Sequence, residues 1–266
     1  MKIVFMGTPD FSVPALEELA KVHQVAAVVT QQDRPKGRGH KMQYTPVKEK
    51  ALELNIPVYQ PEKVKNPEFV DILREINPDV IVVIAFGQIL SKEILDLPKY
   101  GCINVHASLL PKYRGAAPIQ WAVIDGEEET GVTTMYMAEG LDTGDVIDTA
   151  VIKLDEKETG GSLFDKLAIE GGKLIVETLS KLENGTATRT PQDDEKSSYA
   201  GKITKELGQI DFTKPAVTIE RLIRGLNPWP SAYTTLDGKA MKVWDATVEE
   251  GNVTEKTGEI VEIAKH

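Results

Sequence analysis

Residues 80–85, VIVVIA, are apolar at every position. A strand with apolar side chains on both faces is typical of a parallel sheet that is covered by helices on both sides. Residues 2–6 (KIVFM) and 25–29 (VAAVV) repeat this pattern nearer the N-terminus. Apolar residues at helical spacing predict helices over residues 11–19, 47–54 and 69–76. The alternation predicts an α/β fold with a doubly wound, Rossmann-like parallel sheet.

The pattern changes after Gly131. Two further strands are predicted over residues 132–137 and 146–152, and a long amphipathic helix over 162–182 that stops at Gly185. The polar residues 187–198 are typical of a linker. Beyond it, a helix is predicted over 215–226 and a β-hairpin over 232–248 with its turn at Asp237-Gly238. Residues 258–264 predict the start of another strand, so this smaller β domain is expected to be incomplete in this chain.

Composition narrows the class of protein. A hydrophobic content of 41% and a charged content of 27% are ordinary for a globular chain. No apolar run is long enough to cross a bilayer, and the first predicted strand begins at the N-terminus, which leaves no room for a secretory signal. The single cysteine, Cys102, excludes an internal disulfide and fits a reducing compartment. We therefore expect a cytoplasmic protein with no membrane segment.

The net charge of −10 argues against a nucleic-acid partner, because phosphate binding needs positive potential. Residues 34–48 nevertheless contain basic residues and no acidic one: Arg34, Lys36, Arg38, Lys41 and Lys48. A local basic patch on an acidic protein can bind RNA, although a charge run is more often just a solvated surface. We expect this segment to be an exposed, mobile loop.

Residues 101–115, GCINVHASLLPKYRG, contain the most informative polar pair. Asn104 and His106 alternate with apolar residues, so their side chains lie on one side of a predicted strand. Polar groups in a central strand need a partner, a ligand or water. A lone histidine here would be a satisfied core residue, but the asparagine and the following Pro-, Arg- and Gly-containing loop favour a site. Asparagine can donate to an oxyanion and histidine can exchange a proton.

A carboxylate that could set the charge of this imidazole is available in the turn at residues 140–144, GLDTG. Spacing alone does not separate Asp142 from Asp145 or Asp148. Metal binding is not expected, because the four histidines are scattered without ligand spacing. Gly7 lacks the G-x-G-x-x-G pattern, so a dinucleotide site is weakly supported. Cys102 is a weak candidate for a nucleophile.

Several motifs together resemble the folate-dependent formyltransferases. They are FMGTPDF at 5–11, TQQDRPKGRGHK at 30–41, INVHASLLPKYRGAAPIQWA at 103–122, GLDTGD at 140–145, KITKELGQIDF at 202–212 and NPWPSAY at 227–233. The resemblance extends over essentially the whole chain. The N-V-H…S-L-L-P-x-Y-R-G pattern with the downstream L-D-T-G is specific to the superfamily, and D-R-P-x-G-R-G-x-K is typical of its members that act on tRNA.

The resemblance implies transfer of a formyl group from 10-formyltetrahydrofolate, a co-substrate, to the α-amino group of methionyl initiator tRNA, without a metal. It implies that Asn104, His106 and Asp142 form the catalytic set, and it thereby selects Asp142. The implied folate-binding residues are Phe86, Gly87, Gln88, Ile89, Leu90, Ser108, Leu109, Leu110 and Pro111. The implied tRNA-binding residues are Arg34, Lys36, Arg38 and Lys41.

With the resemblance, residues 1–186 are expected to form the catalytic domain, 187–205 a linker and 206–266 a partial, OB-like tRNA-binding domain. We expect a monomer. A formyltransferase for an amino sugar nucleotide would share the catalytic residues without needing the basic segment. A glycinamide ribonucleotide enzyme would lack the domain after the linker. A non-catalytic RNA-binding α/β module would need neither Asn104 nor His106.

Overall fold

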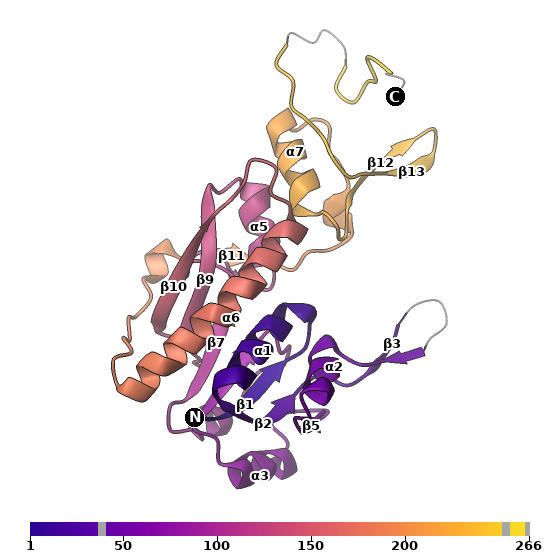
Figure 1. Ribbon diagram of the computed structural model, residues 1–266. Helices are drawn as coiled ribbons and strands as arrows, with labels where there is room; N and C mark the ends of the chain where they lie inside the picture. Colours follow the sequence, from indigo (N-terminus) through magenta and orange to yellow (C-terminus); the bar gives the residue numbers. More distant parts are fainter. Residues whose placement is uncertain (37–40, 252–255, 264–266) are drawn as a thin grey trace.

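A seven-stranded sheet forms the centre of the larger part of the molecule (Figure 1). The computed structural model describes residues 1–36, 41–251 and 256–263. In spatial order the strands are β10 (Val146–Lys153), β9 (Glu129–Tyr136), β7 (Cys102–His106), β6 (Val80–Ile84), β1 (Lys2–Gly7), β2 (Gln24–Val29) and β5 (Val58–Tyr59). The last five of these are parallel to one another. β9 pairs antiparallel with both β7 and β10, so in this sheet β9 alone runs against the direction of the other strands. The connection between β9 and β10 is too short for a crossover, which accounts for their antiparallel pairing.

Helices cover both faces of this sheet, so the predicted doubly wound fold is confirmed. One face packs against α1 (Val13–Val22), α2 (Pro46–Glu53), α5 (Pro118–Asp125) and α6 (Gly160–Asn184). The other face packs against α3 (Pro67–Ile76) and α4 (Lys92–Leu95). The predicted helices are present within a few residues of their expected bounds, and α6 ends at Gly185 as expected. In the described residues, no helix has both the length and the apolar content needed to cross a membrane.

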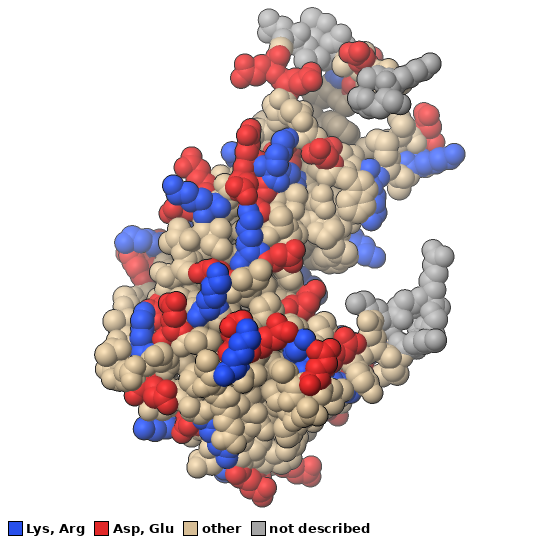
Figure 2. All heavy atoms as spheres, in the orientation of Figure 1, with Lys and Arg blue, Asp and Glu red and all other residues tan. Residues whose placement is uncertain are grey.

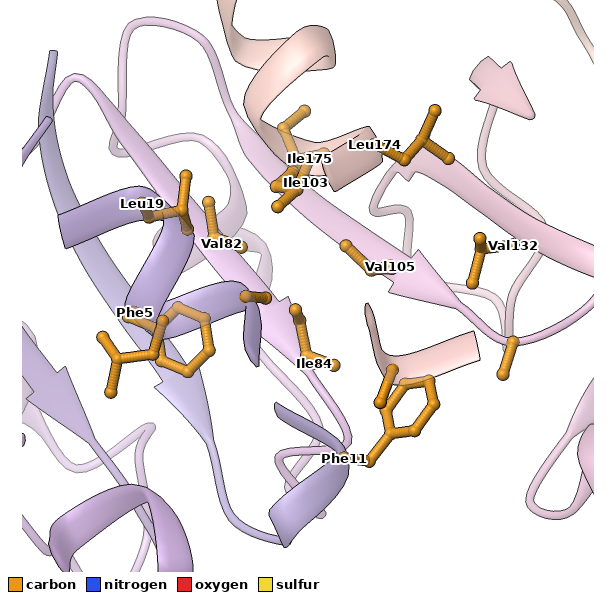
Figure 3. Close-up of a cluster of buried hydrophobic side chains, with 14 of the residues drawn as sticks. Phe5, Phe11, Leu19, Val82, Ile84, Ile103, Val105, Val132, Leu174 and Ile175 are labelled. Atoms are coloured by element: carbon orange, nitrogen blue, oxygen red, sulfur yellow. The ribbon is translucent and has the colours of Figure 1, made fainter. Parts of the chain in front are cut away.

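Alternation along β7 separates its apolar and polar side chains. Ile103 and Val105 lie in the apolar cluster under α6, together with Ile175 (Figure 3). Cys102 belongs to the cluster on the opposite face. Because successive side chains of a strand point to opposite faces, Asn104 shares the face of Cys102 rather than that of α6. Asn104 and His106 therefore lie on the face of β7 that is opposite to α6, near the loops that follow β6 and β9.

The C-terminal part contains α7 (Ala216–Gly225) and an antiparallel hairpin of β12 (Ala232–Leu236) and β13 (Lys239–Val243). α7 packs against α5 of the larger part, with apolar contacts that include Trp121 and Leu222. The helix and hairpin were both predicted. The further strand predicted over 258–264 is wrong for the described residues 256–263, where Ile260 and Ile263 are exposed and no neighbouring strand pairs with them.

The segment that follows α6 and leads to the C-terminal part makes contacts of its own with the larger part. It is irregular apart from a bridge between Thr190 and Val146, a 3-10 turn (Asp194–Lys196) and the short strand β11 (Tyr199–Ala200). β11 pairs in parallel with β8 (Arg114–Gly115), which follows β7 in the chain. The residues predicted to be a linker therefore return to the larger part and pack beside the loop after β7.

The basic segment 34–48 is not a continuous loop, so that prediction is corrected. β3 (Arg34–Lys36) and β4 (Lys41–Gln43) form an antiparallel pair, and α2 begins at Pro46. The Thr45 side chain accepts a hydrogen bond from the Lys48 backbone N–H at 3.2 Å, and a proline at the first helical position favours this start. The Lys48 ammonium lies 2.5 Å from the Asp33 carboxylate. Burial raises the pKa of the Asp33 carboxyl, but hydrogen bonds, including that from Lys48, lower it by more, so the pKa is lowered overall. Arg38 lies outside the described residues.

Candidate active site

A cavity of about 720 Å³ lies at the carboxyl ends of β6 and β7, where a doubly wound sheet is expected to bind its ligands. Three segments form its walls: the loop at residues 85–90 after β6, the turn at residues 137–142 after β9, and residues 115–120. Asn104, His106 and Asp142 all line it. The remaining lining is largely apolar, with Phe11, Phe86 and others. The cavity can therefore hold a flat, mostly apolar ligand next to a small polar cluster.

His106 is held at the end of β7 by the loop that follows it. The ring is buried, and its Nε2 lies 2.9 Å from the backbone carbonyl oxygen of Tyr113. Since a carbonyl oxygen can only accept, Nε2 carries a proton. The second ring nitrogen, Nδ1, lies 3.7 Å from Oδ2 of Asp142. A proton on Nδ1 would therefore create an imidazolium directly beside a carboxylate.

Asp142 is fixed by an unusual turn. Its backbone has a positive φ of 53°, which aspartate tolerates better than most residues. Two residues later, a Cβ on Gly144 would lie 1.6 Å from the carbonyl oxygen of Tyr136, so only glycine fits there. The Asp142 carboxylate accepts a hydrogen bond from the Gly115 backbone N–H at 2.8 Å. The turn chemistry and this contact together aim the carboxylate at His106.

The other two aspartates that spacing had left open have different partners. Asp145 pairs with the Arg189 guanidinium at 2.7 Å. Asp148 pairs with the Lys181 ammonium at 2.5 Å and accepts a hydrogen bond from Thr178. Of these three carboxylates, Asp142 is therefore the one that the structure places beside His106.

Asn104 has unused hydrogen-bonding capacity. Its Nδ2 donates to the carbonyl oxygen of Val83 at 3.1 Å, which leaves one N–H of the amide unassigned. Its Oδ1 is buried and has no hydrogen-bond partner among the described residues. Buried polar atoms are almost always paired in native proteins, so an orphaned one in a cavity wall indicates a place for a polar group of a ligand.

Comparison with known families assigns the chain. A model of the formyl transferase family matches residues 1–179, and a model of the formyl transferase C-terminal domain matches residues 202–266. The chain belongs to the formyltransferase family. Two relatives named methionyl-tRNA formyltransferase are 62% identical (Agathobacter rectalis) and 56% identical (Clostridioides difficile). Each alignment covers 100% of this formyltransferase and 86% of the relative.

Solved structures with low sequence identity have the same fold. The sugar 3N-formyl transferase WlaRD matches with a TM-score of 0.70 at 23% identity, over 92% of this chain and 85% of that one. The N-formyltransferase from Helicobacter canadensis matches with a TM-score of 0.69 at 21% identity, over 92% of this chain and 86% of that one. At this level of identity the likeness concerns the formyltransferase fold alone.

The structure divides the predicted folate-binding residues of the formyltransferase into two groups. The loop after β6 lines the cavity with Phe86, Gly87, Gln88, Ile89 and Leu90. The other group does not line it: Ser108, Leu109, Leu110 and Pro111. Ser108 is fully buried and its hydroxyl donates to the carbonyl oxygen of Lys112 at 2.6 Å, which shapes the loop itself. Direct folate contact by these four residues therefore stays a prediction.

Tyr113 supports the histidine from outside the cavity. Its backbone has a positive φ of 58°, and its hydroxyl oxygen lies 2.9 Å from carboxylate oxygens of both Asp125 and Glu127, which share its single proton as acceptors. Burial and then these two carboxylates hold the pKa of the phenol well above its usual range. Tyr113 is therefore a neutral donor that anchors the loop, so that its carbonyl group stays directed at the His106 ring.

Sequence reasoning missed the contributions of Gln192 and Tyr199 to the site of the formyltransferase. Tyr199 lines the cavity with a largely exposed ring, and Gln192 contacts the Asp142 turn. These residues lie in a short polar stretch without periodicity, so no local pattern could have indicated them. Within the described ranges, no group of three or more His, Cys, Asp or Glu residues could hold a metal ion.

Proposed function

We propose that this chain transfers the formyl group of 10-formyltetrahydrofolate to the α-amino group of methionyl initiator tRNA. The observation that carries the proposal is the meeting of an amide, an imidazole and a carboxylate in one largely apolar cavity. Close relatives that are aligned over the whole chain are named methionyl-tRNA formyltransferases. The proposal includes a monomeric, cytoplasmic protein with a catalytic domain at 1–186, a connection at 187–205 and a tRNA-binding domain at 206–266.

The cavity fits the proposed co-substrate. Its size suits the flat ring of a folate, and the unpaired Oδ1 of Asn104 provides a polar contact for it. The loop at residues 86–90 would hold the ring, with its backbone groups and with apolar side chains. When bound, 10-formyltetrahydrofolate supplies an activated formyl carbon that an amine can attack.

The three polar residues then have separate tasks. The free N–H of Asn104 and a protonated Nδ1 of His106 would donate to the formyl oxygen as negative charge develops there. Mutagenesis of such donors in other enzymes indicates about 3–4 kcal/mol of barrier lowering for each. Asp142 would stabilise the imidazolium and, through a water molecule, accept the proton released by the amine. Collapse of the tetrahedral species would then break the bond between the formyl carbon and N10 of the folate, and N10 takes up a proton as it leaves. No covalent bond to the protein is required.

The β3–β4 hairpin is the proposed tRNA contact. The sequence from β3 to β4 contains Arg34, Lys36, Arg38 and Lys41, and these two strands project to the right in Figure 1, as the β12–β13 hairpin does. On the face shown in Figure 2, the described basic and acidic residues are interspersed rather than separated by sign. A basic hairpin without acidic residues, in a protein of net charge −10, therefore offers a distinct positive element for phosphates.

The double substitution Arg38→Ala with Lys41→Ala is expected to raise KM for methionyl-tRNA and to leave KM for folate unchanged. Each lost phosphate contact should also flatten the log–log salt dependence of tRNA binding by about one unit. Steady-state kinetics at several salt concentrations measure both effects. Lys173→Ala on α6, whose ammonium pairs with Glu170, is the control and should change neither value. Unchanged tRNA kinetics and salt slope in the double variant would remove the hairpin from the proposal.

An acceptor screen tests the function itself. The full chain with 10-formyltetrahydrofolate is expected to formylate methionyl initiator tRNA, and not a dTDP-linked amino sugar or glycinamide ribonucleotide. Transfer of labelled formyl groups to each acceptor is the measurement. Formylation of the sugar nucleotide in place of the tRNA would refute the proposed acceptor. No transfer to any amine would refute the enzymatic function.

A further inference from the structure

Gln192 connects two loops of the site by its side-chain amide. Its Nε2 donates to the backbone carbonyl oxygens of Asp142 at 2.9 Å and Gly144 at 2.7 Å. Its Oε1 accepts from the Arg114 guanidinium, from Nε at 3.0 Å and from a terminal nitrogen at 2.8 Å. The side chain is half-buried. One amide thus uses both of its N–H groups on the catalytic turn and its oxygen on β8.

These two loops are the ones whose spacing sets the catalytic geometry. On the β8 side, Tyr113 accepts the hydrogen bond from His106 and Gly115 donates to Asp142. The distance of 3.7 Å between His106 and Asp142 therefore depends on how β8 lies against the turn. Gln192 links the same two elements from the outside.

The turn needs such an external link. Asp142 has a positive φ, and the adjacent Leu141 side chain is 60% exposed, so apolar packing does little to hold the turn. Its carbonyl groups need hydrogen-bond partners, and Gln192 provides one for two of them. A neutral amide can do this without adding charge beside the Asp142 carboxylate.

We infer that Gln192 is a positioning residue for Asp142, so that one side chain of the segment between α6 and β11 helps to set the geometry of the active site. The inference rests on the proposed function for its catalytic consequence. Gln192 does not line the cavity and acts through the turn. Its loss should therefore affect the chemical step rather than the binding of either substrate.

Gln192→Leu removes both donations and is expected to lower kcat for formyl transfer about 10- to 100-fold, because small displacements of a catalytic group have effects of this size. KM for tRNA and for folate should stay within about twofold. In an Asp142→Asn background the same substitution should change kcat by about twofold or less, since residues that act as a unit are not additive. Equal losses in both backgrounds would show a merely structural role and overturn the inference.

Gln192→Glu tests separately the contact of residue 192 with Arg114 and its contact with the turn. A carboxylate can still accept from Arg114, but it faces the two carbonyl oxygens of the turn without a donor. The loss of kcat should equal or exceed that of Gln192→Leu if the turn contact matters. Wild-type kcat in Gln192→Glu would overturn the inference. Asp194→Asn is the matched control, because it touches the same Arg114 through an 82% exposed side chain and does not touch the turn. It should leave kcat unchanged.

Hydrogen exchange gives a readout that does not depend on activity. The Gly115 amide is protected by its bond to Asp142, so in Gln192→Leu it should exchange about tenfold faster while Tm changes by only a few degrees. Unchanged exchange at Gly115 would overturn the inference. If the wild type formylated no acceptor while the exchange rate rose, the proposed function would fall and the role of Gln192 in holding the turn would stand.

Discussion

Replacing His106 with alanine is expected to lower kcat for formyl transfer about 1,000-fold, with much smaller changes in KM for either substrate. The imidazole makes its main contact as charge develops on the formyl oxygen, so its loss raises the barrier more than it weakens binding. Single-turnover kinetics with 10-formyltetrahydrofolate and methionyl-tRNA separate the chemical step from binding. An unchanged kcat would exclude His106 from the reaction.

The variant also leaves the Tyr113 carbonyl group without its partner, which can cost about 1–3 kcal/mol of stability. Tm and tetrahydrofolate binding should therefore be measured beside kcat, so that misfolding is not taken for a catalytic effect. His23→Ala is the matched control. The His23 ring contacts the N-terminal amino group at 3.3 Å, away from the cavity, and kcat should stay within about twofold.

Asp142→Asn is expected to lower kcat about 100- to 1,000-fold. The amide oxygen of asparagine can still accept from Gly115, so the turn should keep its shape while the negative charge beside His106 is lost. The imidazolium then has no counter-charge, and the released proton has no carboxylate to accept it. The loss should appear in kcat measured under single-turnover conditions, and a wild-type kcat would contradict the role of this carboxylate.

Asp145→Asn and Asp148→Asn are the controls for Asp142→Asn. Both aspartates lie close to Asp142 in the sequence, but they pair with Arg189 and Lys181. Neither carboxylate is paired with His106, so kcat should change little in either variant. The Asp145–Arg189 pair is partly exposed, so its loss should change Tm little, whereas Asp148 is largely buried and accepts from Thr178, so Asp148→Asn should lower Tm. A loss of kcat in Asp145→Asn comparable to that in Asp142→Asn would mean that charge near the turn matters, rather than the position of one carboxylate.

The features that sequence predicted well have a local periodic cause. Residues 80–85 are apolar on both faces, and β6 is a buried strand. The alternation at residues 102–106 placed Asn104 and His106 on one side of β7, and both line the cavity. Patterns with periods of two or 3.6 residues indicate strands and helices because burial of one face follows the same period.

The features that were missed depend on contacts between distant residues. β8 and β11 are two residues each, and the residues that they pair are far apart in the sequence. Likewise, the sequence spacing does not distinguish Asp142 from Asp145 and Asp148. Asp142 lies beside His106 because of the turn at Gly144 and the hydrogen bond from the Gly115 N–H, which involve residues distant in the sequence. The loop expected over residues 34–48 was wrong because Thr45 and Pro46 start a helix within it. The helix predicted over residues 47–54 overlaps the end of that predicted loop.

The late pairing of β8 with β11 has a consequence for biosynthesis. A ribosome releases Asn104, His106 and Asp142 well before Tyr199 and Ala200, and N-terminal regions generally begin to fold while synthesis continues. A nascent chain can thus complete the central sheet while Gly115 still lacks its neighbour strand. In the finished structure, a Cβ on Gly115 would lie 2.7 Å from the Ala200 carbonyl oxygen, which shows how closely the late segment covers the earlier loop. We therefore expect ribosome-bound chains that end before residue 200 to be folded but catalytically silent.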